Sequence, residues 1–272
     1  MVSFLAYSFM QRAFFAGLFI AITCAILGVF LVLRKDAMLG HGLAHVTFGG
    51  VALGLFLNIL PLTAALCVAI VSALGIIKLR EKAGVYEDTA IGIFSSIGMA
   101  TGIILASLAG GFNVGLMSYL FGNILAISKT EVLTSMVLTI IAFVTIIVFY
   151  QKLLFITFDP DSAKASGIRV RHFESILILL TAVVVVLGMK IVGLLLVTAL
   201  IVIPAAAGLQ IARSFFQAIV ISVIVSIFSV SIGLFFAFHL NLPASGTIIL
   251  LAAIFFLFLF SVRMIRMRTG AI

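Results

Sequence analysis

Long apolar segments separated by short polar ones make up most of this 272-residue chain. Each apolar segment holds roughly 20 residues, the length that a helix needs to cross the hydrocarbon core of a bilayer. Nine such segments are present, and we expect membrane-spanning helices at residues 13–33, 38–58, 60–77, 89–109, 131–150, 173–189, 191–211, 215–238 and 244–262. No polar segment is long enough to fold separately, so the pattern predicts an all-α polytopic membrane protein with a single transmembrane domain over residues 1–272.

Residues 111–128 are apolar but are interrupted by three glycines and two asparagines. Irregular backbone of this kind is tolerated at membrane depth where protein or water covers it. A full crossing here would also move the basic segment that follows residue 150 to the opposite side of the membrane. We therefore expect a re-entrant half-helix, a feature that commonly marks a permeation path.

The composition excludes a soluble globule, because 65% of the residues are hydrophobic and only 9% are charged. The net charge of +8 does not indicate a nucleic-acid partner, because the cations lie at the ends of the predicted spans. Thirteen of the 16 Lys and Arg residues follow the first, third, fifth, seventh or ninth span. We expect a multi-pass protein of the bacterial plasma (inner) membrane, and the positive-inside rule predicts an N-terminus outside and a C-terminus in the cytoplasm.

The longest polar segment, at about 158–171, has the signals of a short helix on the cytoplasmic side. Asp159 can cap it, Pro160 suits the first helical position, and Asp161 favours the positive end of the dipole. Gly167 supplies a left-handed exit. A capped helix on this face is a candidate docking element; the alternative is a solvated loop with one helical turn.

His41 and His45 are four residues apart, so a continuous helix places both imidazoles on one face. Imidazole suits zinc, copper or nickel, whereas manganese prefers carboxylates and water. Two histidines do not complete a tetrahedral zinc shell, so a second copy of the pair, Asp88 or Asn113 would have to add ligands. The alternatives are a solvated or hydrogen-bonded histidine pair, and an Asp88 that only meets the dipole of its own span.

Five segments of the chain resemble the manganese/zinc/iron permease family of ABC transporters. They are residues 27–45, 86–93, 117–125 and 190–206, together with Asp-Pro-Asp-Ser-Ala-Lys-Ala-Ser-Gly-Ile at 159–168. The last is similar to the coupling segment of ABC importer permeases of the metal, siderophore and cobalamin type. The resemblance implies the fold of those permeases, a homodimer, cytoplasmic ATP-binding subunits and an extracytoplasmic metal-binding protein. It also implies that contact with the ATPase is made by Asp159, Pro160, Asp161, Ala163 and Gly167.

At the histidine pair the resembled family commonly reads Gly-Asp-x-x-x-His on the metal's path, so His45 matches that pattern and His41 departs from it. We expect the permease subunit of an ATP-driven importer of a divalent transition metal, zinc rather than manganese or iron. We expect no permanently bound cofactor and no enzyme activity. The chain lacks G-x-x-x-x-G-K-[ST], so a separate subunit would hydrolyse ATP. The rival is a stand-alone secondary metal carrier, which usually places carboxylates within its spans, whereas the acidic residues here lie in loops or at span boundaries.

Overall fold

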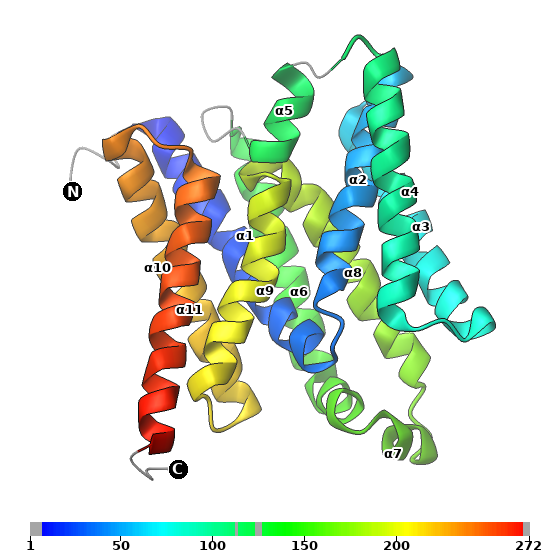
Figure 1. Cartoon of the computed structure of the whole chain (residues 1–272), viewed down its shortest axis with the longest axis vertical. Coiled ribbons are helices and arrows are strands. Elements are labelled where there is room, and N and C mark those ends of the chain that lie inside the picture. The colour runs from blue at the N-terminus through cyan, green and yellow to red at the C-terminus, as the bar shows by residue number, and fades with distance from the viewer. Residues whose placement is uncertain (1–6, 112–113, 123–126, 269–272) are drawn as a thin grey trace.

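The computed structural model describes residues 7–111, 114–122 and 127–268, which form helices and connections with no β-strand among them (Figure 1). In chain order the helices are α1 (Ser8–Leu33), α2 (Met38–Phe56), α3 (Pro61–Ala83), α4 (Glu87–Leu108), α5 (Val114–Phe121), α6 (Lys129–Phe158), α7 (Pro160–Ala165), α8 (Val170–Val192), α9 (Leu194–Ile211), α10 (Phe215–Leu240) and α11 (Ala244–Arg268).

Within the described residues, nine helices are long and apolar enough to cross a membrane, and they coincide with the nine predicted spans. The differences lie at the ends, since α3 continues to Ala83 and α6 to Phe158, past the predicted ends at 77 and 150. A helix satisfies its own backbone hydrogen bonds, so it does not have to stop where its side chains become polar. The predicted all-α membrane fold is confirmed.

Helix α5 is the exception among the apolar segments, because it contains only eight residues. At 1.5 Å per residue it is about 12 Å long, less than half of the roughly 30 Å of hydrocarbon in a bilayer. The helix that the structure describes within 111–128 is therefore too short to cross the bilayer, as the glycines of this segment predicted. Asn113 and residues 123–126 lie outside the part of the chain that the structure describes.

The long helices run alternately in opposite directions, so each connection lies at one of two ends of the bundle (Figure 1). The α7 end holds α7, the α1–α2, α3–α4 and α9–α10 connections, and the last turns of α11. The α5 end holds α5, the start of α1, and the α8–α9 and α10–α11 connections. These two names are used below.

The core of the bundle is built on α1 and α2, which are far more buried than α6 and α11. Over the most apolar 18-residue stretch, 72% of the residues are buried in α1 and in α2, but 22% in α6 and 11% in α11. Small residues allow close packing in the core. Gly28 of α1 meets the carbonyl of Ile201 in α9, where no Cβ would fit. The exposed apolar side chains of α6 and α11 are then the surface available to lipid.

Candidate functional site

The two predicted metal ligands lie on one face of α2, one turn apart. Their Nε2 atoms are 3.0 Å apart, and one ring donates a hydrogen bond to the other. The ring centroids are 4.5 Å apart and the rings are perpendicular. A tetrahedral zinc ion bound at about 2.0–2.1 Å would hold two ring nitrogens roughly 3.3–3.4 Å apart. A small side-chain adjustment therefore brings His41 and His45 to the geometry of two ligands of one ion.

Over its first three turns, packing of α2 leaves open only the histidine pair and Met38. His41 is exposed and His45 is half-buried, whereas the residues between them are buried. Glycines explain this orientation. A Cβ on Gly42 would overlap Ile91 of α4, and one on Gly49 would lie 2.5 Å from the carbonyl oxygen of Gly98. Because the glycine face of α2 is pressed against α4, the histidine face is turned outward.

Within the part of one chain that the structure describes, no third candidate ligand joins the pair. Among the residues that the structure describes, no three His, Cys, Asp or Glu side chains form a cluster that could hold a metal. Asp88 is exposed in the first turn of α4 and belongs to no such cluster. Asn113 lies outside the described ranges. The described part of one chain therefore supplies two nitrogen ligands and an open side.

The pair lies closer to the α7 end of the bundle than to the α5 end. His45 is seven residues after the first residue of α2, which corresponds to about 10 Å along a helix of 19 residues. Helix α5 lies at the opposite end (Figure 1). An ion that entered near α5 would have to pass most of the bundle before it met the pair.

A cluster of ion pairs surrounds the start of α2 at the α7 end. Asp36, in the α1–α2 connection, is only 2% exposed. Its carboxylate accepts a hydrogen bond of 2.8 Å from Arg80 of α3 and lies 3.6 Å from Arg34. Arg34 also donates to Glu174 of α8. This inner ion cluster, Arg34, Asp36, Arg80 and Glu174, links the helix that carries the histidines to α3 and α8. The sequence analysis did not identify Asp36 as a structural residue.

The predicted coupling segment forms helix α7, with the expected signals at its ends. The carboxylate of Asp159 accepts a hydrogen bond of 2.9 Å from the backbone N–H of Ser162, and Pro160 is the first helical residue. Hydrogen bonds from the side chain and backbone of Ser162 lower the pKa of the Asp159 carboxyl, so this cap stays ionised, and therefore in place, until the pH falls below that lowered pKa. Gly167 has a φ of 81°, the left-handed exit.

Helix α7 is held against its own chain by one small residue. Ala163 is fully buried, whereas Asp161 and Lys164 are exposed. Glu81 of α3 pairs with Arg171 at the start of α8, just beyond the segment. The segment is thus a short helical element between α6 and α8 (Figure 1), and its Asp161 and Lys164 are exposed.

At the α5 end, the end of α5 is packed backbone to backbone on the break between α8 and α9. Gly122 has a φ of 80°, and a Cβ there would lie 2.5 Å from the carbonyl carbon of Val192. Gly193 has a φ of 92°, and a Cβ there would lie 2.5 Å from the nitrogen of Gly122. We call this contact the glycine lock. The sequence analysis found neither role, although positive φ is a usual reason for glycine at a helix end.

An ion pair and a capping box fix the start of α6 beside the glycine lock. Ser128 caps α6 by accepting from the backbone of Glu131, whose side chain reaches back to the Ser128 N–H. Lys190 of α8 pairs with Glu131 at 2.7 Å. The spacing Ser-x-x-Glu is the usual signature of such a box and could have been recognised in the sequence.

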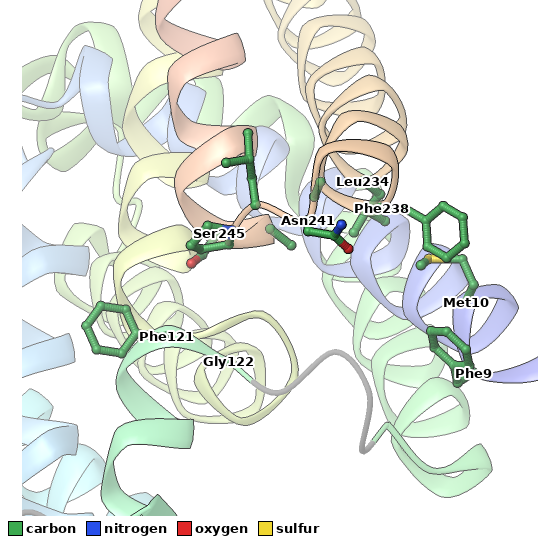
Figure 2. Close-up of a pocket in the computed structure, with 12 residues that line it drawn as sticks. Phe9, Met10, Phe121, Gly122, Leu234, Phe238, Asn241 and Ser245 are labelled. Carbon is green, nitrogen blue, oxygen red and sulfur yellow. The ribbon is translucent and has the colours of Figure 1, made fainter. Parts of the chain in front are cut away.

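A cavity of about 790 Å³ opens at the α5 end, between the start of α1, the end of α5 and the α10–α11 turn. Figure 2 shows Asn241 of that turn and Ser245 at the start of α11 across the opening from Phe9 and Met10, with Phe121 and Gly122 at one side. The wall is mainly apolar. None of the predicted metal ligands lines it, so the cavity and the histidine pair are separate features of the bundle.

Comparison with known proteins decides the family. A family model described as the ABC 3 transport family matches residues 6–263. The chain belongs to this family. The family that the sequence blocks predicted, the permeases of metal ABC transporters, is thereby confirmed.

Named relatives of this ABC 3 chain are membrane subunits of metal transport systems. It is 34% identical to the high-affinity zinc uptake system membrane protein ZnuB of Haemophilus influenzae, over 90% of this chain and 94% of that one. It is 31% identical to the manganese transport system membrane protein MntC of Halalkalibacterium halodurans, over 93% of this chain and 86% of that one. The two identities are too similar to choose a metal.

The solved structure of PsaBC from Streptococcus pneumoniae in complex with Fab contains a chain with the same fold. The TM-score is 0.85 at 31% identity, over 96% of this chain and 95% of that chain. The arrangement of the helices described above is therefore that of an ABC transporter permease.

Proposed function

We propose that this chain is the permease subunit of an ATP-driven importer of a divalent transition metal, most of all zinc. In this proposal the metal is delivered by an extracytoplasmic metal-binding protein and released to the cytoplasm. The observation that carries the proposal is the position of His41 and His45, with ring nitrogens 3.0 Å apart on the open stripe of a core helix. In an ABC 3 transport protein, a pair of metal ligands in that position marks the path of the metal.

Zinc is favoured by the chemistry of the pair, not by the relatives. Two imidazoles are borderline-soft nitrogen donors, which suit zinc better than manganese. The relatives named above are a zinc and a manganese system, at 34% and 31% identity. The resembled family commonly has aspartate at the position of His41, an oxygen donor that would suit manganese. Manganese is the first alternative, and iron the second.

A second copy of the chain would complete the site. Two nitrogen ligands from each of two copies make four, the number that zinc prefers. The open stripe of α2 supports this arrangement, because imidazoles turned toward hydrocarbon are costly and a partner copy would cover them. Four ligands shared between two copies also separate when the copies move, so the ion can leave, unlike an ion in a closed structural site.

The charges at the bundle ends favour an α7 end in the cytoplasm. Arg34, Arg80, Arg171, Arg213 and Arg263 are examples of the basic residues found at that end. The positive-inside rule then puts the N-terminus outside and the C-terminus in the cytoplasm. An impermeant thiol reagent added to intact cells should leave a Ser162→Cys protein in a Cys24→Ser/Cys67→Ser background unlabelled. Labelling from outside would reverse this topology.

Energy would come from separate ATP-binding subunits that dock on α7. Asp159, Pro160, Asp161 and Gly167 give this helix fixed ends, and Ala163 fixes its inner face, so force on it would reach α6 and α8. The secondary-carrier alternative is less well supported. Of the described acidic side chains, Asp36 and Glu174 pair with arginines at one end of the bundle and Glu131 pairs with Lys190 at the other. An ion-coupled carrier would be expected to hold such groups at mid-span.

The test is metal accumulation in cells whose other zinc and manganese importers are deleted, with permease abundance measured in each variant. Wild type should accumulate zinc in preference to manganese. His41→Ala/His45→Ala should reduce zinc uptake at least about tenfold, because no ligand remains. His239→Ala, which removes a histidine at the α5 end, is the matched control and should keep uptake within about twofold.

His41→Asp tests the choice of metal in the same cells. It restores the commoner pattern of the family and adds a harder donor, so relative uptake should shift toward manganese. The proposal fails if wild type takes up manganese but not zinc, or if the double alanine variant keeps normal uptake of both metals.

A further inference from the structure

The open face of α2 extends one turn beyond the histidine pair, to Met38 at the start of the helix and at the α7 end of the bundle (Figure 1). In residues 38–52, all of which the structure describes, the only side chains that are not buried are Met38, His41 and His45. Met38 is 52% exposed. All three are residue types that can bind a metal ion, two of them through nitrogen and one through a thioether sulfur. A sulfur donor therefore follows the two nitrogen donors along the same face.

Met38 and His41 are three residues apart on one helix, so their Cβ atoms are neighbours at roughly 5–6 Å. A helical side chain leans toward the N-terminus of its helix, so the His41 ring extends over the turn that begins with Met38. The methionine side chain is unbranched and flexible, so its sulfur can adapt to an ion held there. His45 is about 10 Å along the helix from Met38, too far to share that ion. His41 can thus serve two positions, one at a time: one with His45 and a second with Met38.

The donors of this second position are soft, because the carboxylate closest to it in sequence is already engaged. Asp36, two residues before Met38, is only 2% exposed, and its carboxylate pairs with Arg34 and Arg80. In the described part of the chain, no Asp, Glu or Cys forms a group of three with the two histidines. Thioether sulfur selects Cu(I) among the metals of proteins, whereas the usual zinc ligands are Cys, His, Asp and Glu.

The charge around the start of α2 favours a monovalent ion over a divalent one. The first turn of α2 contains no acidic residue, and the helix dipole makes this turn positive. Lys35, three residues before Met38, is exposed. Coulomb repulsion is proportional to the charge of the ion, so it costs a divalent ion about twice as much as a monovalent one. Donor softness and local charge therefore favour the same class of ion.

We propose that Met38 and His41 form a second metal position, about one turn nearer the α7 end than the histidine pair, which binds soft monovalent ions of the Cu(I) class. The proposal rests on the proposed function, because it takes His41 as a metal ligand. Zinc leaving the pair would pass Met38 without being held, whereas a soft ion would stay. In two copies of the chain that meet at α2, the position would hold two sulfurs and two imidazoles.

The test is equilibrium dialysis of the purified protein, with its ATPase subunits if these remain bound, against Ag(I) or zinc. Ag(I) is the probe because it shares the softness and charge of Cu(I) and keeps its oxidation state in buffer. All proteins carry Cys24→Ser/Cys67→Ser, since the exposed Cys67 thiol would itself bind Ag(I). Met38→Leu keeps the size and apolar character of the side chain. It should weaken the tightest Ag(I) binding at least about tenfold, with zinc affinity within about twofold of wild type.

Three further variants make the comparison specific. Met136→Leu removes a methionine of similar exposure, 42%, from α6, with no histidine within four residues, and should keep Ag(I) affinity within about twofold. Met38→Cys supplies another soft sulfur and should restore Ag(I) binding. His45→Ala should weaken zinc binding at least about tenfold and Ag(I) binding less than about threefold, whereas His41→Ala should weaken both.

Unchanged Ag(I) affinity in Met38→Leu, or an equal loss in Met136→Leu, would overturn the proposal and leave Met38 as an apolar side chain that faces lipid or a second copy. Equal losses of zinc and Ag(I) affinity in Met38→Leu would also overturn it, since they would indicate one joint position for both metals. The proposed function fails by a different result. If His41→Ala/His45→Ala keeps normal zinc uptake while Met38→Leu and His41→Ala lose Ag(I) binding, the soft-ion position stands without the zinc path.

Discussion

The two ends of the bundle hold their helices together by different means. At the α7 end, long charged side chains join α1, α3 and α8 around the buried carboxylate of Asp36. At the α5 end, the glycine lock brings two backbones into contact, with the single described ion pair Glu131–Lys190 beside it. Long side chains can follow a small shift of a helix and keep their partners. A backbone contact through two glycines cannot adjust in this way, because there are no side chains to follow the shift.

The largest effect is expected from Asp36→Ala, which removes the centre of the inner ion cluster. Arg34 and Arg80 side chains are only 9% and 13% exposed, so they would lose a buried counter-charge. Loss of one partner from a buried ion pair costs about 3–5 kcal/mol. Thermal unfolding of the purified protein in detergent would measure it. Asp161→Ala, at an exposed aspartate of the same end, should cost well under about 1 kcal/mol; equal losses would show that the ion cluster does not hold this end.

A somewhat smaller effect is expected at the other end from Gly193→Ala. The added Cβ meets the backbone of Gly122, and the φ of 92° disfavours any L side chain. Together these should cost about 2–4 kcal/mol. Gly110→Ala separates the two causes, because Gly110 has a φ of 96° but no neighbour within 4 Å of its Cβ position. If both variants lose the same stability, the close packing of Gly193 on Gly122 does not stabilise the α5 end.

Gly167→Val tests whether the α7 end transmits force through the coupling segment. Its φ of 81° penalises valine, while no atom lies within 4 Å of the Cβ position, so the fold should persist and only the exit from α7 should distort. We expect association with the ATPase to fall several-fold in co-purification, and uptake with it. Gly84→Val, at another left-handed helix end of the same face, is the matched control. Unchanged ATPase association in Gly167→Val would exclude α7 as the docking element.

The smallest effect is expected from breaking the ion pair between Lys190 and Glu131 at the α5 end. Lys190 and Glu131 side chains are 41% and 17% exposed, so water screens their attraction, and exposed pairs contribute at most about 1 kcal/mol. A double-mutant cycle with Lys190→Gln and Glu131→Gln should give a coupling free energy below that of a cycle on Arg34 and Glu174. If the coupling free energy of the Lys190–Glu131 cycle were the larger of the two, electrostatic attraction and not backbone packing would be the main contribution to stability at the α5 end.

Much of this organisation could be predicted from the sequence, because membrane helices are read from local composition. The nine spans were placed correctly, and the caps of α7 followed from Asp159, Pro160 and Gly167. The spacing of His41 and His45 placed them on one helix face. By contrast, Asp36 sits in a short polar connection like any other, and its burial depends on Arg80, 44 residues away. A contact between residues so far apart in the sequence cannot be predicted from the local sequence pattern.

By itself the sequence determined which segments enter the membrane, which segment cannot cross, and which end carries the positive charge. These properties depend on transfer of side chains from water to lipid, which each segment undergoes largely on its own. Only the tertiary structure decided that the glycine face of α2 turns its histidines outward and that Gly122 meets Gly193. These are contacts between segments far apart in the chain, and their geometry is set by which small residues allow two helices to approach.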